Sequence, residues 1–237
     1  MLVSIIIPYY KKQSYIKKTI YSILNQSYQK FEIIIVNDEP GKLSKNILSA
    51  IKKKDKRIKI INNTKNIGAG RSRNKAINVA KGKYIAFIDS DDLWKKNKLK
   101  TQINIMRKFN YNVSHTAYYI IDNNGKKLAL RKSKNLNFKT LKDSCDIGLS
   151  TVIINKIILK KDIMFSNYIT KEDYYLWLKI TKHGEIFHYI DQPLSYWRKT
   201  HNSLSSSIIQ KFIDSFKVYN HFENNFIISI YRTIILS

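Results

Sequence analysis

Residues 84–94 read YIAFIDSDDLW, an apolar run followed at once by three carboxylates, Asp89, Asp91 and Asp92. An uninterrupted apolar run of this length is typical of a strand that is buried on both faces. The carboxylates repel one another unless positive charge lies beside them, which either a cation or the N-terminus of a helix can supply. The stretch therefore predicts a buried strand that ends in either a cation site or the first turn of a helix.

Apolar runs of the same kind alternate with helical patterns over the first 90 or so residues. The expected strands are 3–7, 31–36, 58–61 and 84–88. The expected helices carry apolar faces of Ile16, Ile20, Ile23 and Leu24 with Ser14 as N-cap, of Leu43, Ile47, Leu48 and Ile51, and of residues within 69–80. Strands that alternate with helices pair in parallel through right-handed crossovers. Ligands bind such open sheets outside the carboxyl ends of the strands, where both Asp38 and the carboxylates of 89–92 fall.

The pattern changes in the second half of the chain. The expected elements are a helix at about 93–109, an antiparallel hairpin of 113–122 and 127–130, a strand at 150–154, a helix at 172–180, and two strands at 185–190 and 194–198. Neither a Pro/Gly-rich linker nor an internal repeat interrupts the chain. We therefore expect one α/β domain with a mostly parallel central sheet and a mixed second half.

The charge balance is strongly basic. Lys and Arg number 43 against 17 Asp and Glu, a formal net charge of +26. Such an excess favours a polyanionic partner, but A/T-rich codons also produce many Lys, Ile, Asn and Tyr residues, and the lysines are spread along the chain. No pattern of a helix-turn-helix, an RRM or a zinc module is present, so we expect no specific nucleic-acid partner.

The cysteine content and the length of the apolar runs indicate where in the cell the protein is expected. The single cysteine, Cys145, excludes a disulfide framework and a Cys-based zinc site. The sequence shows no charged-then-apolar leader at its start and no apolar run near the roughly 18–20 residues that span a bilayer. We expect a cytoplasmic protein, and a peripheral position on the inner face of the cytoplasmic membrane stays open.

Five segments in order resemble one family. They are VSIIIPYY (3–10), SILNQSYQKFEIIIVND (22–38), NIGAGRSRNKAINVAKGKYIAFIDSDD (66–92), KEDYYLWLKI (171–180) and PLSYWRKTHNSLS (193–205). Together they resemble the family 2 glycosyltransferases of the GT-A fold, a Rossmann-like fold for nucleoside-diphosphate sugars, and in particular bacterial enzymes that build surface polysaccharides such as LPS or capsule. The likeness covers about 1–206. It implies a nucleotide-sugar-binding half at 1–92, an acceptor-binding half at 93–206 and a helical tail at 207–237.

The resemblance implies roles for the residues at the matched positions. Pro8 and Tyr10 shape the nucleobase pocket, and Asp38 accepts a hydrogen bond from a base N–H. Donor binding is expected of Pro8, Tyr10, Asp38, Asn66, Arg73, Asp89, Asp91 and Arg198. Asp91, Asp89 and His201 are the expected ligands of a Mn2+ or Mg2+ ion, which suits carboxylate oxygens.

Asp173 is the expected general base. The resemblance implies inversion: Asp173 takes a proton from an acceptor hydroxyl as that oxygen attacks the anomeric carbon. The alternative for Glu172 and Asp173 is a pair of helix-start carboxylates, which favour the N-terminus of any helix. The expected donor is a nucleoside-diphosphate sugar, with UDP the first choice, and the expected acceptor is a glycan or a lipid-linked glycan.

Two departures and several rival functions stay open. Glu39-Pro40-Gly41 stands where many relatives have Gly-Ser, and Lys11-Lys12 stands where they often have Asn, which puts contacts at the nucleotide edge in doubt. The rivals are a nucleotidyltransferase on the same fold, a basic nucleic-acid-binding protein, and a catalytically inactive GT-A scaffold. The first lacks the Gly-rich loop it would need after the opening strand, and the intact Asp91 and Asp173 argue against the last.

The tail lies beyond the family motifs. Apolar residues recur at helical spacing over 208–235, broken by polar Asn220, Asn224, Asn225 and Ser229. This pattern fits a pair of helices that pack on the domain or form a homodimer contact, and it also fits a helix that lies in the interface of an anionic membrane.

Overall fold

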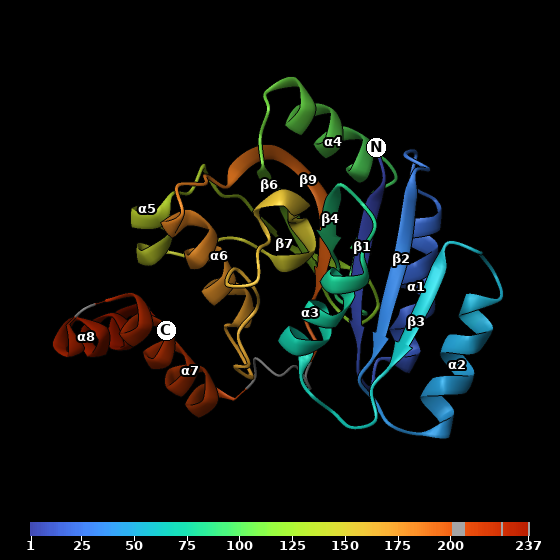
Figure 1. Ribbon diagram of the computed structural model, residues 1–237, viewed down its shortest axis with the longest axis horizontal. Coiled ribbons are helices and arrows are strands. Elements are labelled where there is room, and N and C mark those ends of the chain that lie inside the picture. The colour runs from blue at the N-terminus through green and yellow to red at the C-terminus, as the bar shows by residue number, and fades with distance from the viewer. Residues whose placement is uncertain (201–206, 224, 237) are drawn as a thin grey trace.

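The apolar run of residues 84–88 forms the centre of a mixed sheet in the computed structural model, which describes residues 1–200, 207–223 and 225–236. Within these residues the sheet has nine strands in the order β3-β2-β1-β4-β8-β6-β9-β5, with β7 paired to β6. The first half consists of β1 (Val3–Tyr9), α1 (Gln13–Leu24), β2 (Phe31–Asn37), α2 (Lys42–Lys52), β3 (Ile58–Asn62), α3 (Ala69–Val79) and β4 (Tyr84–Phe87). Figure 1 shows α1 and α2 on one face of this half and α3 on the other.

The second half adds strands of both directions. It consists of β5 (Leu93–Trp94), α4 (Lys98–Lys108), β6 (Val113–Ile121), β7 (Lys127–Arg131), α5 (Phe138–Asp143), η1 (Leu149–Thr151), β8 (Ile153–Asn155), η2 (Lys156–Ile158), α6 (Glu172–Lys182) and β9 (His188–Arg198), and α7 (Ile208–Phe222) and α8 (Phe226–Leu236) follow. β1 pairs in parallel with β2 and β4, and β2 with β3. β8 is antiparallel to β4 and β6, whereas β9 is parallel to β6. The expected parallel first half and mixed second half are confirmed.

β1, β2 and β4 are largely apolar because both of their faces are covered. Ile5 and Ile7 of β1 lie in one core, together with Ile16 of α1. Ile6, between them, lies in the other core with Trp177 of α6. Side chains alternate between the two faces of a strand, so a strand with a core on each side needs apolar residues at every position.

Several sequence-based boundaries are wrong. α1 begins at Gln13, so Lys12 and not Ser14 is the N-cap, and no side chain caps it. Leu43 is 63% exposed on α2 rather than part of its buried face. Residues 93–94 do not begin a helix, because they pair with β9 before α4 starts at Lys98.

The C-terminal part of the second half also differs from expectation. The segments 185–190 and 194–198 belong to one strand, β9, whose register against β6 shifts near Pro193. The expected strand at 150–154 is shorter, since residues 149–151 form a 3-10 turn before β8. The expected α6 is confirmed, with Leu176, Trp177 and Ile180 buried.

The tail forms two helices. α7 buries Val218, Tyr219 and Phe222 in the core that also holds Trp177 of α6. α8 lies beyond α7 at the periphery of the molecule, as Figure 1 shows. Among the described residues, no helix combines the length and the apolar character that crossing a bilayer would require.

Candidate active site

The carboxylates that follow β4 have three different environments. Asp92 is buried, and its two oxygens accept hydrogen bonds from Ser150 Oγ at 2.5 Å and from the backbone N–H of Arg198 at 2.9 Å. Thr19 of α1 donates its hydroxyl to the carbonyls of Ser90 and Asp92. Asp92 therefore fixes the loop after β4 and is not free to bind a ligand.

Asp91 already lies against a cation that the protein supplies. The ammonium of Lys12 is 2.7 Å from Asp91 Oδ2 and donates a second bond to Thr200 Oγ1 at 3.2 Å. Burial and the neighbouring carboxylate of Asp89 raise the pKa of Asp91, and Lys12 opposes that rise. Asp91 is thus a buried carboxylate that needs a positive charge beside it to stay ionised.

Arg73 of α3 links the carboxylate that follows β4 to the start of α6. Its guanidinium is 4% exposed and lies 2.8 Å from Asp89 Oδ1 and 2.7 Å from Glu172 Oε1. Asp89 follows β4, whereas Glu172 begins α6. Both ion pairs are made to protein carboxylates, so Arg73 positions these residues, and its direct contact with the donor stays a prediction.

The first turn of α6 carries the expected base. Asp173 is half-buried, and Tyr174 donates its backbone N–H to Asp173 Oδ1 at 2.7 Å. In the described part of the chain it has no ion-pair partner within 4.0 Å, unlike Glu172 beside it. Burial raises the pKa of Asp173, the positive charge of Arg73 lowers it, and Asp89 raises it further. Burial also raises the pKa of Glu172 to about 7 against the pull of Arg73. A carboxylate with a raised pKa and no ion-pair partner is a suitable general base.

Asp38 anchors the loop that leads into α3. Its Oδ1 accepts hydrogen bonds from the backbone N–H of Ile67 and from Asn63 Nδ2, and its Oδ2 accepts one from the N–H of Gly68, all at 2.8 Å. Asn66 lies in this loop with an exposed side chain. The structure therefore assigns Asp38 a supporting role that the sequence did not predict, and its contact with a nucleobase stays a prediction.

The remaining predicted residues differ in accessibility. Tyr10 is 37% exposed just after β1, and Pro8 is half-buried within β1 beside Val36 of β2. Arg198 is buried, and its guanidinium donates to the backbone carbonyls of Asp91, Asp122 and Asn123. Arg198 therefore braces the loop after β4. His201 lies outside the described residues.

Sequence analysis did not predict the ion pairs that two residues of the site, Lys12 and Glu172, make. Lys12 was noted only as a departure from the family pattern, and Glu172 only as part of the family segment 171–180 or as a helix-start carboxylate. Neither sequence position indicates that Lys12 reaches Asp91 or that Glu172 reaches Arg73, because 79 and 99 residues separate the partners. Ion pairs between such distant residues depend on the tertiary fold.

A divalent metal fits this arrangement only with help from a ligand. The described residues contain no group of three or more His, Cys, Asp or Glu side chains that could hold a metal by themselves. Asp89 and Asp91 offer carboxylate oxygens, which hard cations such as Mn2+ and Mg2+ prefer. The ammonium of Lys12 on Asp91 is a stand-in cation in the same place. Asp91 and Asp89 therefore suit a cation whose coordination diphosphate oxygens would complete.

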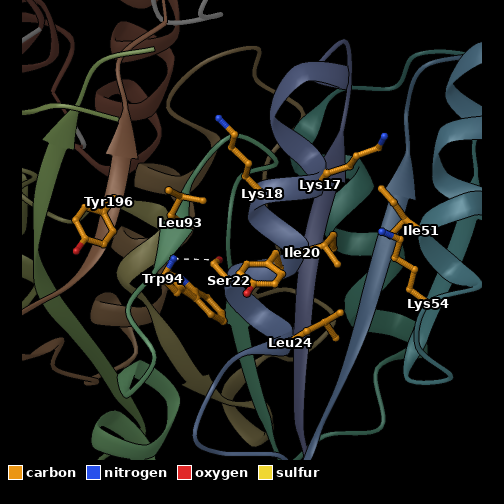
Figure 2. A pocket seen from close by; sticks show the side chains of 11 residues that line it. Lys17, Lys18, Ile20, Ser22, Leu24, Ile51, Lys54, Leu93, Trp94 and Tyr196 are labelled. Atoms are coloured by element: carbon orange, nitrogen blue, oxygen red, sulfur yellow. Dashed lines mark hydrogen bonds between the residues drawn. The ribbon is translucent and has the colours of Figure 1, made fainter. Parts of the chain in front are cut away.

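A separate groove lies on the α1–α2 face of the sheet (Figure 2). Its volume is 540 Å³, and its lining includes Lys17, Lys18, Tyr21, Trp94 and Tyr196. Ser22 of α1 accepts a hydrogen bond from the backbone N–H of Trp94 at its wall. None of the predicted site residues lines this groove, so it is not part of the candidate active site.

The parallel half-sheet, the carboxylates after β4 and the acidic start of α6 together are features of the GT-A fold of glycosyltransferases. The described chain superimposes on Staphylococcus aureus TarS 1–349 in complex with UDP-GlcNAc with a TM-score of 0.75 at 22% identity, covering 93% of this chain and 65% of that one. A mannosyltransferase from Pyrobaculum calidifontis in complex with GDP-Man and Mn2+ gives a TM-score of 0.71 at 13% identity, covering 97% of this chain and 69% of that one. The family model of Glycosyl transferase family 2 matches residues 4–165. The chain belongs to this family, and it is a glycosyltransferase.

Relatives of known name support the assignment. WfgD of Escherichia coli, a UDP-Glc:alpha-D-GlcNAc-diphosphoundecaprenol beta-1,3-glucosyltransferase, is 35% identical over 235 residues, which are 97% of this chain and 90% of WfgD. TuaG of Bacillus subtilis, named as a teichuronic acid biosynthesis glycosyltransferase, is 35% identical over 208 residues, which are 87% of this chain and 82% of TuaG. The predicted family and enzyme class are confirmed.

Proposed function

We propose that this enzyme is an inverting, metal-dependent glycosyltransferase that moves a sugar from a UDP-sugar to a hydroxyl of a lipid-linked glycan during the synthesis of a surface polysaccharide. The observation that carries the proposal is the bridge made by Arg73. It holds Asp89, at the carboxyl end of β4, next to the first turn of α6 with Asp173. Donor-side carboxylates and a free carboxylate on the acceptor side thus flank one guanidinium.

The reaction follows from these positions. Asp173 accepts the proton of an acceptor hydroxyl while that oxygen forms a bond to the anomeric carbon. The bond from that carbon to the diphosphate breaks on the opposite face, so the configuration inverts, and the electron pair leaves with the nucleoside diphosphate. A Mn2+ or Mg2+ ion held by Asp91 and Asp89 would neutralise charge on that leaving group. His201 stays a proposed additional ligand.

The choice of donor and acceptor rests on relatives and not on a pocket in this chain. UDP-Glc and a diphosphoundecaprenol-linked acceptor appear in the name of WfgD, and UDP-GlcNAc is bound in the TarS structure. A lipid-linked acceptor would bring the enzyme to the inner face of the cytoplasmic membrane. Tyr10, exposed after β1, and Pro8 are the proposed walls of the nucleobase pocket.

A donor screen tests the proposal without knowledge of the acceptor. Purified enzyme is incubated with UDP-, GDP- and dTDP-sugars with Mn2+, with Mg2+ or with EDTA, and release of the nucleoside diphosphate is measured. We expect hydrolysis of one UDP-sugar that depends on the metal. Full turnover in excess EDTA would refute metal dependence, and turnover of a GDP- or dTDP-sugar alone would refute the UDP assignment.

A further inference from the structure

The helix α8 has its polar and apolar sides reversed relative to a helix on a soluble protein. Ser229 and Thr233 are its buried residues, at 0% and 1% exposure. Its exposed side chains are Phe226, Ile227, Ile228, Ile230, Tyr231, Ile234 and Ile235. A surface helix of a globular domain normally turns its apolar stripe inward and its polar side to water. α8 does the opposite, although the chain has abundant lysine to place at exposed positions.

Ion pairs hold α8 in this orientation. Arg232 is its one charged residue, and its guanidinium lies 2.9 Å from both Asp143 Oδ1 and Glu223 Oε1. Lys142 adds a further pair to Glu223 at 2.9 Å. These contacts tie the side of α8 that carries Arg232 to α5 and to the end of α7. The apolar side therefore faces outward because the charged side is fixed against the domain.

α7 extends the exposed apolar surface. Ile208, Ile209, Phe212 and Ile213 in its first two turns are 43–81% exposed. The two helices meet through Phe216 and Phe226, whose rings contact edge to face at 5.6 Å between centroids. We call the exposed apolar residues of α7 and α8 the tail surface. Exposed apolar residues gathered on two neighbouring helices mark an interaction site.

Lysines on α7 and near it indicate the kind of partner. Lys217 is exposed on α7, 3.5 Å from Asp214 Oδ1, and Lys182 is exposed at the end of α6 over the ring of the buried Phe222. Lys211 also lies on α7. Apolar side chains with lysines beside them match the acyl chains and headgroups of anionic lipids, which attract nearby basic residues. We propose that the tail surface docks on an anionic membrane surface, an inference that rests on the proposed lipid-linked acceptor.

The docking helices are connected to the catalytic base. Asp214 of α7 accepts hydrogen bonds from the backbone N–H and the hydroxyl of Thr170 at 2.9 and 3.1 Å, and it is 1% exposed. Thr170 precedes Asp173 by three positions. Membrane docking through α7 and α8 would therefore hold the loop before α6 at a fixed height above the lipid.

Vesicle sedimentation tests the docking. Ile227→Gln combined with Ile234→Gln removes two exposed apolar side chains, and Gln keeps the helix propensity high. The matched control is Leu43→Gln with Ile157→Gln, since these residues are 63% and 73% exposed on other parts of the surface. We expect wild type and control to pellet with vesicles of phosphatidylcholine and phosphatidylglycerol, and less with phosphatidylcholine alone. Binding of the tail variant should be weaker by about tenfold or more.

Other outcomes overturn the inference. Equal pelleting of tail variant and control would show that the tail surface does not touch lipid, as would a wild type that does not pellet. If light scattering shows a wild-type dimer that the tail variant loses, the surface joins two copies instead. A lower melting temperature for the tail variant but not for the control would show that these side chains are core. Donor hydrolysis in the same variants separates the two proposals, because vesicle binding without any hydrolysis would refute the function and leave the docking intact.

Discussion

Replacing Arg73 should expose how strongly the two halves of the site depend on one another. Arg73→Met keeps much of the side-chain volume but strands Glu172, whose side chain is 12% exposed, without its partner at 2.7 Å. Removing one member of a buried pair costs up to about 3–5 kcal/mol, and Glu172 limits that cost at pH 7 by taking up a proton, because burial already raises its pKa to about 7. The Asp89 side chain is 33% exposed, so water compensates much of its loss.

That cost translates into a measurable shift of the melting temperature. For a chain of this size each kcal/mol lowers the melting temperature by about 2–4 °C, so Arg73→Met should melt below wild type by up to roughly 20 °C. Glu172→Gln added to Arg73→Met removes the stranded carboxylate and should recover most of the loss. Lys132→Met is the matched control, since its pair with Asp191 is exposed on both sides and should leave the melting temperature unchanged.

Thermal unfolding followed by circular dichroism at pH 7 measures all four proteins. The reasoning fails if Arg73→Met melts within about 2 °C of wild type, a difference worth only about 1 kcal/mol. It also fails if the double variant melts below Arg73→Met, because Glu172 would then contribute something other than an unpaired charge.

Three further predictions concern the chemistry. Asp91→Asn should abolish metal-dependent donor hydrolysis without lowering the melting temperature, and a variant that hydrolyses donor normally would exclude Asp91 as a metal ligand. Asp173→Asn should bind the UDP-sugar as wild type does in calorimetry, while the transfer rate falls by about 10²–10⁴. Because the pKa of Asp173 is raised, the wild-type transfer rate should decline on acidification at a higher pH than it would with an ordinary Asp. Lys12→Met should strengthen Mn2+ binding to the nucleotide-free enzyme several-fold in electron paramagnetic resonance titrations, since no ammonium competes for Asp91, and unchanged binding would show that Lys12 and the metal occupy different places.

The architecture could be predicted because the residues that form the core of the sheet follow local sequence patterns. Uninterrupted apolar runs such as 84–88 require burial on both faces, and alternation with helices requires parallel pairing. The predicted ends of helices and strands were wrong where tertiary contacts determine them. Leu93 and Trp94 follow an acidic segment that resembles a helix start, but pairing with β9 holds them as a strand.

The site residues were proposed from their motifs, and the structure shows which of them lie together. Asp89, Asp91 and Asp173 were placed by their motifs, and the structure brings Asp89 and Glu172, the neighbour of Asp173, onto Arg73. The partners of Arg73 and Arg198 could not be read from the sequence, because an arginine in a motif is equally compatible with a ligand phosphate, a carboxylate or a backbone carbonyl. Only the fold decides which of these acceptors lies within reach.

The Arg73 bridge also limits how members of this family can be recombined. Exchanging the segment after residue 92 between this chain and a relative would combine the proposed donor half of one with the proposed acceptor half of the other. Such a chimera would take Arg73 from one parent and Glu172 from the other. The ion pair therefore forms only where both parents carry these two residues at equivalent positions in the fold. The junction between the halves is therefore a compatibility requirement, and parents for recombination should be chosen by this pair before their donor and acceptor preferences are considered.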